Sequence, residues 1–273
     1  MSAFAEEHVI YRYKYLPFSP GSLETILGGT IKFTCGLDFN DPFDCNPHFD
    51  LTHINQIHKV RPDLFKAAGD RRGLSPAQRV AQRSQFIARL RNRILDGTFR
   101  RQQLEGVGLV SLSRNATNVL MWSHYAGDHT GFVLEFRIPV LGDTGDIAHT
   151  TDRLLPFPVA YQPGRPIIKI GQELPQDLVD KIVLTKSRDW VYEEEERVVD
   201  HLRGPGIHQY RREEILSTVI AGSRMSATDR DTLAKAVSAA AKNGLEGLSL
   251  YDAVQSSIEY RLLIPGHPRL DGQ

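Results

Sequence analysis

Cysteine is scarce in this sequence: Cys35 and Cys45 are the only two among 273 residues, and they form no CxxC pair. Two thiols exclude a disulfide framework as the main source of stability. A zinc site is an alternative because His48, His53 and His58 follow these cysteines, but the spacing matches no tight ligand pair. We therefore expect no metal, and the 41% hydrophobic content is enough for an ordinary core.

Long hydrophobic runs are also lacking. No stretch approaches the roughly 20 apolar residues that a membrane span requires. The first residues, MSAFAEEHVIYRYKY, carry two acids where a signal peptide would have a basic end followed by an apolar run. We therefore expect a cytoplasmic protein without membrane contact.

The common nucleotide and hydrolase signatures are missing. The sequence has no P-loop, no GxGxxG after a predicted strand, no GxSxG and no HExxH. These absences exclude the standard forms of those sites, so an enzymatic function would need a different arrangement of side chains.

Charge is balanced overall but unevenly distributed, with 33 basic and 33 acidic residues. Between Lys59 and Arg101 there are twelve basic and three acidic residues, so this segment carries +9 and the rest of the chain carries −9. Arginines in such a segment can neutralise phosphates, which makes RNA or DNA a candidate partner. Alternatively, they pair with the acidic surface of the same chain. The candidate nucleic-acid-binding residues are Arg79, Arg83, Arg89 and Arg93.

Runs of β-branched and aromatic residues predict the strands. These runs lie at residues 8–16, 30–35, 107–113, 131–137, 217–222 and 258–264, with another strand near 158–161. The loop LDFNDPFDCNPHF, rich in Asn, Asp and Pro, is expected to be ordered, because otherwise its Phe39, Phe43 and Phe49 would be exposed to water.

Helices are predicted from capping residues and apolar periodicity. Ser75 and Pro76 suit the start of a helix to about Leu95, whose apolar arc contains Val80 and Ile87. Further helices are expected from about residue 22, within 118–130, at 175–186 and at 226–242. No linker divides the chain, so we predict a single α+β domain over residues 1–273. It has a mixed or antiparallel central sheet and a basic helical insertion at residues 59–105.

Three motifs carry polar and aromatic side chains together. In NDPFD, Asn40 and Asp41 either contact a ligand or form an Asx turn that places Phe43 in the core. In LMWSHYAGDHTGF, His124 and Tyr125 are candidate site residues, although a buried histidine with satisfied hydrogen bonds is the common alternative.

The third motif is WVYEEEERVV. If the chain is extended from Glu193 onward, Glu193, Glu195 and Arg197 share one face. Two carboxylates and an arginine on one face form a network at the mouth of a core strand, a frequent location for a site. The alternative is a solvated acidic edge strand that blocks aggregation.

The segments YRYKYL, LDFNDPFD, VSLSRNATNVLMWSHYAGDHTGFVLEF, KSRDWVYEEEER and STVIAGSRMS together resemble the bacterial family called domain of unknown function 2971. The resemblance spans nearly the whole chain. Its most specific motifs are NDPF, MWSHYA with the following GF, and WxYExExR. The family name implies a common fold and a motif set without a reaction.

The chain also resembles ADP-ribosyltransferases. These enzymes carry an arginine or histidine on the first strand, an aromatic or hydroxyl residue on the second, and an ExE or QxE turn before a later strand. The matching residues, in the same order, are Arg12, Phe33 or Thr34, Glu193 and Glu195. The second strand lacks Ser-Thr-Ser, so it departs from the family pattern.

This second resemblance implies an ADP-ribosyltransferase-like fold and an enzyme that consumes NAD, either a transferase or a glycohydrolase. It would act as a toxin or phage-defence effector on nucleic acid or protein. Glu195 would stabilise the oxocarbenium character of the transition state, Arg12 would pair with the pyrophosphate, and Tyr13 or Tyr125 would stack on the nicotinamide. Because strand alternation lets either set of side chains face the cleft, Tyr11 or Tyr13 could take the place of Arg12.

The implied catalytic residues are Glu195, Glu193 and His124, and the implied residues for binding NAD, the small-molecule nucleotide, are Arg12, Tyr13, Thr34, Asn40, Asp41, Tyr125 and Arg197. Two other functions stay open. One is a nucleic-acid-binding module or nuclease that uses the basic segment at 59–101. The other is a non-catalytic sensor or interaction domain, which fits if Glu195 and His124 are buried in structural hydrogen bonds.

Overall fold

The computed structural model describes residues 8–140, 151–172 and 178–271. Its largest feature is a nine-stranded sheet. The strands are β1 (His8–Leu16), β2 (Thr30–Cys35), β4 (Gly108–Ser113), β5 (Phe132–Val140), β6 (Phe157–Pro158), β10 (Glu195–Asp200), β11 (Gly206–Gln209), β12 (Leu216–Ala221) and β13 (Ser249–Asp252).

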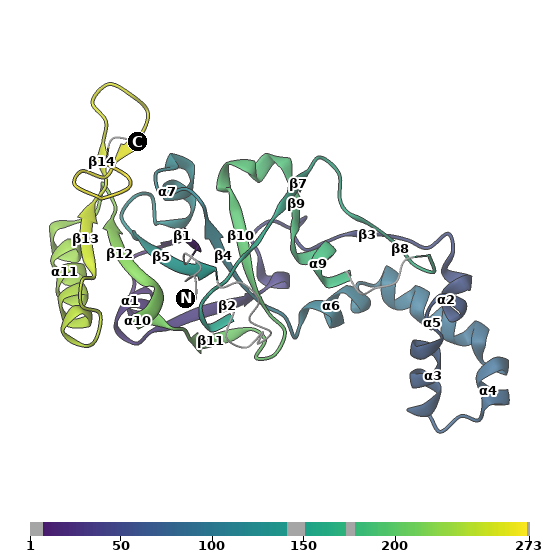
Figure 1. Ribbon diagram of the computed structural model, residues 1–273. Helices are drawn as coiled ribbons and strands as arrows, with labels where there is room; N and C mark the ends of the chain where they lie inside the picture. Colours follow the sequence, from purple (N-terminus) through teal and green to yellow (C-terminus); the bar gives the residue numbers. More distant parts are fainter. Residues whose placement is uncertain (1–7, 141–150, 173–177, 272–273) are drawn as a thin grey trace, which may run out of the picture.

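The strand order is β11-β2-β4-β1-β5-β12-β13, with β10 paired to β4 and β6 paired to β10 (Figure 1). All these pairs are antiparallel except β12 with β13, which are parallel. The sheet is therefore mixed and the predicted α+β class is confirmed. The strands expected at 8–16, 30–35, 107–113, 131–137 and 217–222 correspond to β1, β2, β4, β5 and β12.

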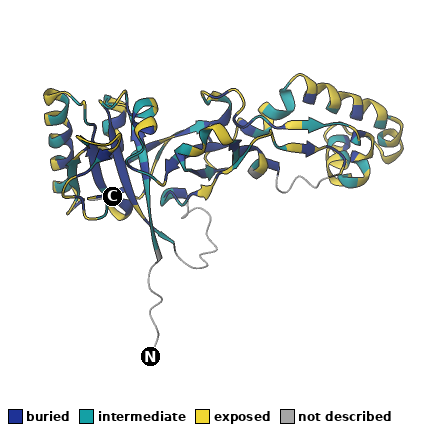
Figure 2. Cartoon of the chain, turned by 90° about the horizontal axis from the view of Figure 1, so that it is seen from above, coloured by how far each residue is buried: buried dark blue, intermediate teal, exposed yellow. Residues whose placement is uncertain are grey.

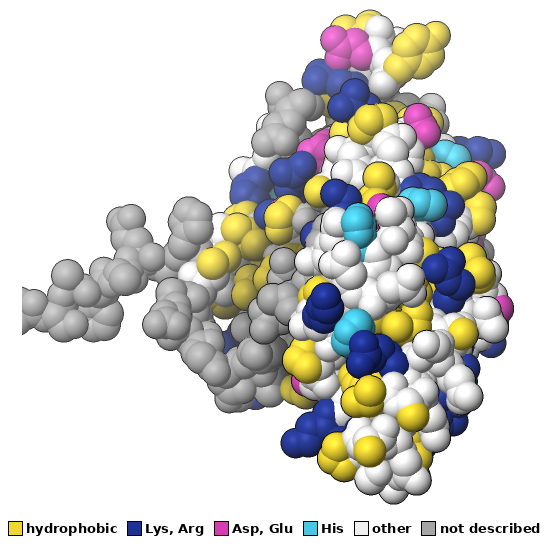
Figure 3. All heavy atoms as spheres, turned by 90° about the vertical axis from the view of Figure 1, so that its right-hand side faces the viewer, with side chains coloured by type: hydrophobic (Ala, Val, Ile, Leu, Met, Phe, Trp, Pro, Cys, Tyr) yellow, Lys and Arg dark blue, Asp and Glu magenta, His cyan; other side chains and the backbone are white. Residues whose placement is uncertain are grey.

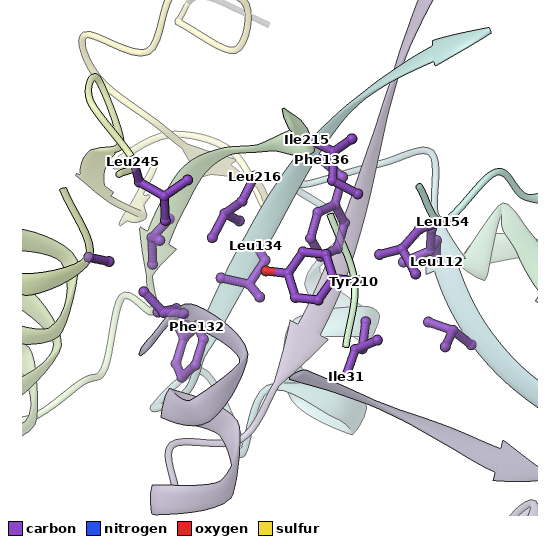
Figure 4. Packing of buried hydrophobic residues seen from close by; sticks show 14 of the residues in the cluster. Ile31, Leu112, Phe132, Leu134, Phe136, Leu154, Tyr210, Ile215, Leu216 and Leu245 are labelled. Carbon is purple, nitrogen blue, oxygen red and sulfur yellow. The ribbon is translucent and has the colours of Figure 1, made fainter. Parts of the chain in front are cut away.

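The main hydrophobic core lies on one face of this sheet. Alternate residues of β5, including Phe132, Leu134 and Phe136, point into it, while the intervening Val133 contributes to a cluster on the other face. Phe136 meets Tyr210 edge to face, with ring centroids 5.6 Å apart (Figure 4). Both faces of β5 are thus covered, which explains its nearly continuous apolar sequence.

Two helices cover this core at the end of the sheet near β12 and β13. They are α1 (Pro20–Leu27) and α11 (Ala227–Lys242). Ser226 caps α11 by accepting a hydrogen bond from the Asp229 amide, and Leu233 and Val237, four residues apart, are buried against the sheet. The predicted helix at 226–242 is therefore confirmed.

Five helices follow one another between β3 (His48–Asp50) and β4. They are α2 (Ile57–Val60), α3 (Pro62–Asp70), α4 (Pro76–Ala81), α5 (Arg83–Leu95) and α6 (Thr98–Leu104). Figures 1 and 2 show that α2 to α5 project from the sheet and expose much of their surface. Buried residues of α5 and α6 still join β4 in a second hydrophobic cluster, which ties the projection to the sheet.

The helix expected from Ser75 to Leu95 is interrupted at Gln82. Ser75 forms the predicted cap, including a capping box with Gln78, and α4 then ends before α5 begins. The prediction that Val80 and Ile87 lie in a single buried apolar arc is therefore wrong for Val80, which is 58% exposed, whereas Ile87 is buried. The interruption turns α4 away, so its apolar residue does not reach the cluster under α5.

Short parallel pairs connect the sheet to the projection. They are β3 with β8 (Ile167–Lys169), and β7 (Ala160–Gln162) with β9 (Thr185–Ser187). The strand expected near 158–161 corresponds to β6 and β7. The helix expected at 175–186 is α9 (Leu178–Val183), and its first residues lie outside the described part of the chain.

The strand expected at 258–264 is wrong for most of its length. Only Leu262–Leu263 form a strand, β15, which pairs with β14 (Val254–Gln255), and Ile258 and Tyr260 are fully exposed in the turn between them. Only the end of the apolar run, Leu262 and Ile264, reaches a core. Among the residues that the structure describes, no helix is long and apolar enough to cross a membrane.

Candidate functional site

The sheet is split beside β4. One edge of β4 pairs with β10 along its whole length, whereas the other edge pairs with β2 at Leu109 and with β1 at Ser113. Among the described residues no strand pairs with this second edge at Ser111. The Lys14 ammonium donates a hydrogen bond to the Ser111 carbonyl oxygen at 3.0 Å and satisfies it instead.

A pocket of about 260 Å³ lies at this split. It is lined by side chains of β1, β2, β4, α7 (Val119–Tyr125), β9, the 3-10 helix η4 (Arg188–Glu193) and β10, and by the segment after β2. The lining combines rings, hydroxyls and charges. Its polar and aromatic members are Tyr13, Lys14, Tyr15, Thr34, Asp38, Phe39, Asn40, Asp44, Ser111, Ser113, Tyr125, Lys186, Glu193, Glu195 and Arg197.

Arg197 is the centre of a buried ion-pair network along one side of the pocket. Its guanidinium is fully buried and donates to both carboxylate oxygens of Asp44, at 2.6 and 3.1 Å. It also donates to both oxygens of Glu195, at 2.8 and 3.0 Å, and to the Val183 carbonyl oxygen at 2.6 Å. The ring of Phe39 lies 4.9 Å from the guanidinium carbon. Such a charge is tolerated without water because nearly all its donors are used.

Lys186 joins a third carboxylate, Glu193, to this network. Its ammonium donates to Glu195 Oε2 at 2.9 Å and to Glu193 Oε2. The Tyr125 hydroxyl donates to the other oxygen of Glu193 at 2.6 Å. Three carboxylates, two cations and a phenol are therefore linked by hydrogen bonds at the pocket wall.

The residue between the two glutamates makes this arrangement possible. Glu194 adopts a left-handed backbone conformation with φ 45° at the end of the 3-10 helix η4 (Arg188–Glu193), and β10 starts only at Glu195. The Ser113 hydroxyl donates to the Glu193 carbonyl oxygen at 2.7 Å and fixes this turn. Glu193 and Glu195 thus face the same pocket. The turn at Glu194 orients them, and not the alternation along an extended strand that the sequence predicts.

The two carboxylates have opposite pKa shifts. Burial disfavours ionisation of Glu195, yet the charges of Arg197 and Lys186 hold its pKa well below its ordinary value. For Glu193, burial raises the pKa, Lys186 opposes the rise, and the Glu195 charge adds to it, so the pKa lies above its ordinary value. Neighbouring acids with separated pKa values are typical of sites that need an ionised and a proton-exchanging carboxyl.

Lys14 has an unusual environment for a lysine. Burial lowers its pKa to about 8, although the Glu195 charge opposes this. Its neighbours Tyr13 and Tyr15 in β1 pack in the cluster around Trp122. The amine therefore exchanges its proton near neutral pH beside the open edge of β4.

Most of the predicted site residues meet at this pocket. Tyr13, Thr34, Asn40, Tyr125, Glu193, Glu195 and Arg197 all line it. The predicted network of Glu193, Glu195 and Arg197 is present, but it is buried and central, because β10 is paired on both sides. The alternative prediction, that this motif forms an exposed acidic edge strand, is therefore wrong.

Arg12 is a correction. It does not line the pocket, and its guanidinium instead forms a bidentate ion pair with Glu196, with N–O distances of 2.6 and 2.8 Å. Alternation gives Arg12 and Lys14 the same face of β1, yet only Lys14 reaches the pocket. The first-strand cation at the pocket is Lys14.

His124 and Asp41 also lie outside the pocket lining. His124 is exposed, with its ring centroid 6.3 Å from that of Tyr192. Asp41 accepts a hydrogen bond from the Phe43 amide at 2.9 Å, which is the expected Asx turn. The turn does not bury Phe43, which is 62% exposed, because Asp44 points inward in its place.

The sequence reasoning missed Asp44, Lys186 and Lys14. Asp44 belongs to the NDPFD motif and Lys186 starts KSRDW, so the motifs themselves could have indicated them. Lys14 had a weaker signal, namely a charge inside a strand rich in tyrosine. Over residues 8–140, 151–172 and 178–271 there is no group of three or more His, Cys, Asp or Glu that could hold a metal, and Cys35 and Cys45 are buried free thiols.

The predicted nucleic-acid-binding arginines lie in the projecting helices. Arg79, Arg89 and Arg93 line a second cavity of about 430 Å³, and Arg83 does not line it. Arg83 instead lies 3.4 Å from His58 Nε2.

Comparison with known proteins identifies one family. Residues 121–198 match the family model described as Protein of unknown function (DUF2971). The matched segment contains Tyr125, Lys186, Glu193, Glu195 and Arg197 and supports the family resemblance. No curated protein and no solved structure matches the chain.

Proposed function

We propose that the pocket at the split of the sheet binds NAD and breaks the bond between nicotinamide and ribose, as an ADP-ribosyltransferase or NAD glycohydrolase does. The observation that supports this is the convergence of three segments in the order that those enzymes use. Lys14 comes from the first strand, Thr34 from the second, and Glu193 and Glu195 from the turn before β10.

The pocket size limits how NAD can bind. Small-molecule sites typically measure about 300–1,000 Å³, and this one measures about 260 Å³. It therefore takes one end of a dinucleotide and leaves the other end outside. The nicotinamide end fits best, since Tyr13 and Tyr125 supply rings for the base and the carboxylates supply acceptors for the ribose hydroxyls.

Glu195 stabilises the reacting ribose. As the glycosidic bond breaks, nicotinamide leaves with the electron pair and positive charge develops on the ribose. The pKa of Glu195 is held so low that its carboxylate stays ionised throughout, and three charge-assisted hydrogen bonds from Arg197 and Lys186 fix its orientation. A fixed anion beside a developing cation lowers the barrier without rearrangement.

Glu193 handles the proton of the acceptor. The bond to the ribose is completed by a hydroxyl or water, which must lose a proton. Burial raises the pKa of Glu193, so its carboxylate accepts a proton more readily than Glu195 does. Lys14, positively charged below its pKa of about 8, pairs with the pyrophosphate in the role first expected of Arg12.

A second candidate function is a nucleotide-binding sensor without turnover. Both oxygens of Glu195 already accept hydrogen bonds from cations, which is also what a purely structural carboxylate would show. The two functions share the pocket and differ in whether bound NAD is cleaved.

Nicotinamide release from NAD by the purified protein tests the proposal. We expect release by the wild type and a loss of 100-fold or more (~2.7 kcal/mol) in Glu195→Gln, within the range found when one electrostatic contact to a transition state is removed. The assay is run with and without RNA, DNA and protein extract, because the acceptor is unassigned. NAD binding without release under any condition would favour the sensor instead.

Glu196→Gln is the matched control. Glu196 is the next residue of the same strand, is equally buried and is also ion-paired, but neither it nor its partner Arg12 lines the pocket. A general loss of stability would affect both variants, whereas a loss of chemistry affects Glu195→Gln alone. Thermal unfolding of each variant shows that the protein assayed is folded.

A further inference from the structure

The projecting helices contain a groove that is larger than the pocket at the split sheet. Its volume is about 430 Å³, and it lies between the segment from α3 to α4 on one side and α5 with α6 on the other. Figure 3 shows this end of the molecule, where basic and hydrophobic side chains alternate and few acidic ones appear. Five arginines line the groove: Arg71, Arg72, Arg79, Arg89 and Arg93.

Most of these arginines lack an acidic partner. Arg79 pairs with Asp70, but in the described part of the chain none of Arg72, Arg89 and Arg93 has a carboxylate within salt-bridge distance. The three acids of the segment are used locally, since Asp63 pairs with Arg61 and Asp96 accepts from the Thr98 amide. The helices α3 to α5, in the segment that carries these arginines, project from the sheet (Figure 1).

The floor of the groove is apolar and aromatic. Phe65 and Phe86 meet edge to face, with ring centroids 5.3 Å apart, and both remain partly exposed. Leu90 and Phe99 continue this surface. Exposed rings between unpaired arginines favour a ligand that has flat apolar surfaces together with negative charges.

We propose that this groove binds single-stranded nucleic acid, with one base against Phe65 and Phe86 and the flanking phosphates on Arg72, Arg89 and Arg93. Arginines spaced four apart on α5 form a row along one wall, which follows a backbone. A duplex keeps its bases stacked inside and cannot place one in a groove of this kind. An acidic peptide or an anionic membrane would supply charge without the base.

The groove is separate from the pocket at the split sheet. The two cavities share no lining residue. Binding at the groove therefore needs neither NAD nor Glu195, and it can fail or succeed independently of the proposed reaction.

Fluorescence anisotropy with a labelled single-stranded RNA or DNA oligonucleotide of uniform sequence tests this proposal on the full-length protein. Each phosphate contact to a single strand contributes about −0.7 to the slope of log K against log salt. Arg89→Gln/Arg93→Gln should therefore reduce the slope by about 1.4 and weaken binding about 25-fold at 0.1 M salt. Arg72→Gln on the opposite wall should weaken binding about fivefold.

Arg91→Gln is the matched control, because Arg91 is an exposed arginine of the same helix that does not line the groove. It should bind like the wild type. Equal losses in Arg91→Gln and Arg89→Gln/Arg93→Gln would overturn the proposal, as would tighter binding of a duplex of equal length. Equal binding of polyphosphate or of vesicles rich in anionic lipid would show that charge alone is recognised, and would overturn it too.

Discussion

Arg197 illustrates how single residues decide this site. Its positive charge lies between Asp44 and Glu195, and none of the three is exposed beyond a few per cent. Removing one partner of a buried ion pair typically costs about 3–5 kcal/mol, because the other charges are left unpaired. Substitutions at Arg197 therefore report on folding, and a residue of the pocket outside this ion-pair network adds an independent probe of the chemistry.

Lys14 is such a residue, and it makes the proposed reaction depend on pH. Its pKa is lowered to about 8, so the amine is charged below this value and neutral above it. If only the charged form binds the pyrophosphate, KM for NAD should rise about tenfold between pH 7 and pH 9. Steady-state kinetics over this range measures it.

Two variants at this position separate charge from shape. Lys14→Arg stays charged throughout, so its KM should not change between pH 7 and pH 9. Lys14→Met is uncharged and should have a high KM that is equally independent of pH. A wild-type KM without pH dependence would contradict the role assigned to Lys14.

The sequence predicted the site residues that lie within recognisable motifs. Glu193, Glu195, Arg197 and Tyr125 were expected and line the pocket. Arg12 does not line the pocket, and a period of two could not have shown this, because Tyr13 and Lys14 from opposite faces of β1 both line it. The gap between β1 and β4 admits the Lys14 side chain as far as the Ser111 carbonyl oxygen, whereas Glu196 holds Arg12.

At the scale of elements, the site depends on where strands stop pairing. The edge of β4 is shared by β2 and β1, and the pocket lies where neither covers it. No local sequence pattern encodes this, since it results from the relative positions of two strands that are far from β4 in sequence. The strands β1, β2, β4, β5 and β12 themselves were predictable, because runs of β-branched and aromatic residues mark them.

Close contact between α7 and the ends of β1 and β5 holds one wall of the pocket. A Cβ at Gly131 would lie 2.2 Å from the Leu16 carbonyl oxygen and 2.8 Å from that of Ala126. Gly131→Ala should therefore lower the free energy of unfolding by about 1–3 kcal/mol, the usual cost of overpacking. Urea denaturation measures this change.

Gly164→Ala is the control for this substitution. No atom lies within 4 Å of a Cβ at Gly164. The free energy of unfolding should change by less than about 0.5 kcal/mol. If both variants had the same stability, the close packing of α7 against β1 would not be what requires glycine at position 131.

Over the whole molecule, the basic segment and the acidic residues of the site lie in different places. The basic segment forms helices that project from the sheet, and the acids of Asp44, Glu193 and Glu195 are buried at the split. The sequence predicted the basic segment and its helices, but the break at Gln82 and the groove depend on packing between helices. The pocket at the split sheet, with its buried charge network, and the groove lined by arginines are thus separate.

A crystal structure of the protein with a non-hydrolysable NAD analogue, with carbon in place of the ribose ring oxygen, shows whether the pocket at the split sheet binds NAD. We expect the nicotinamide end in the pocket, between Tyr13 and Tyr125, with the ribose hydroxyls at Glu195 and the pyrophosphate at Lys14. An analogue bound elsewhere, or a pocket that stays empty at saturating analogue, would contradict this expectation.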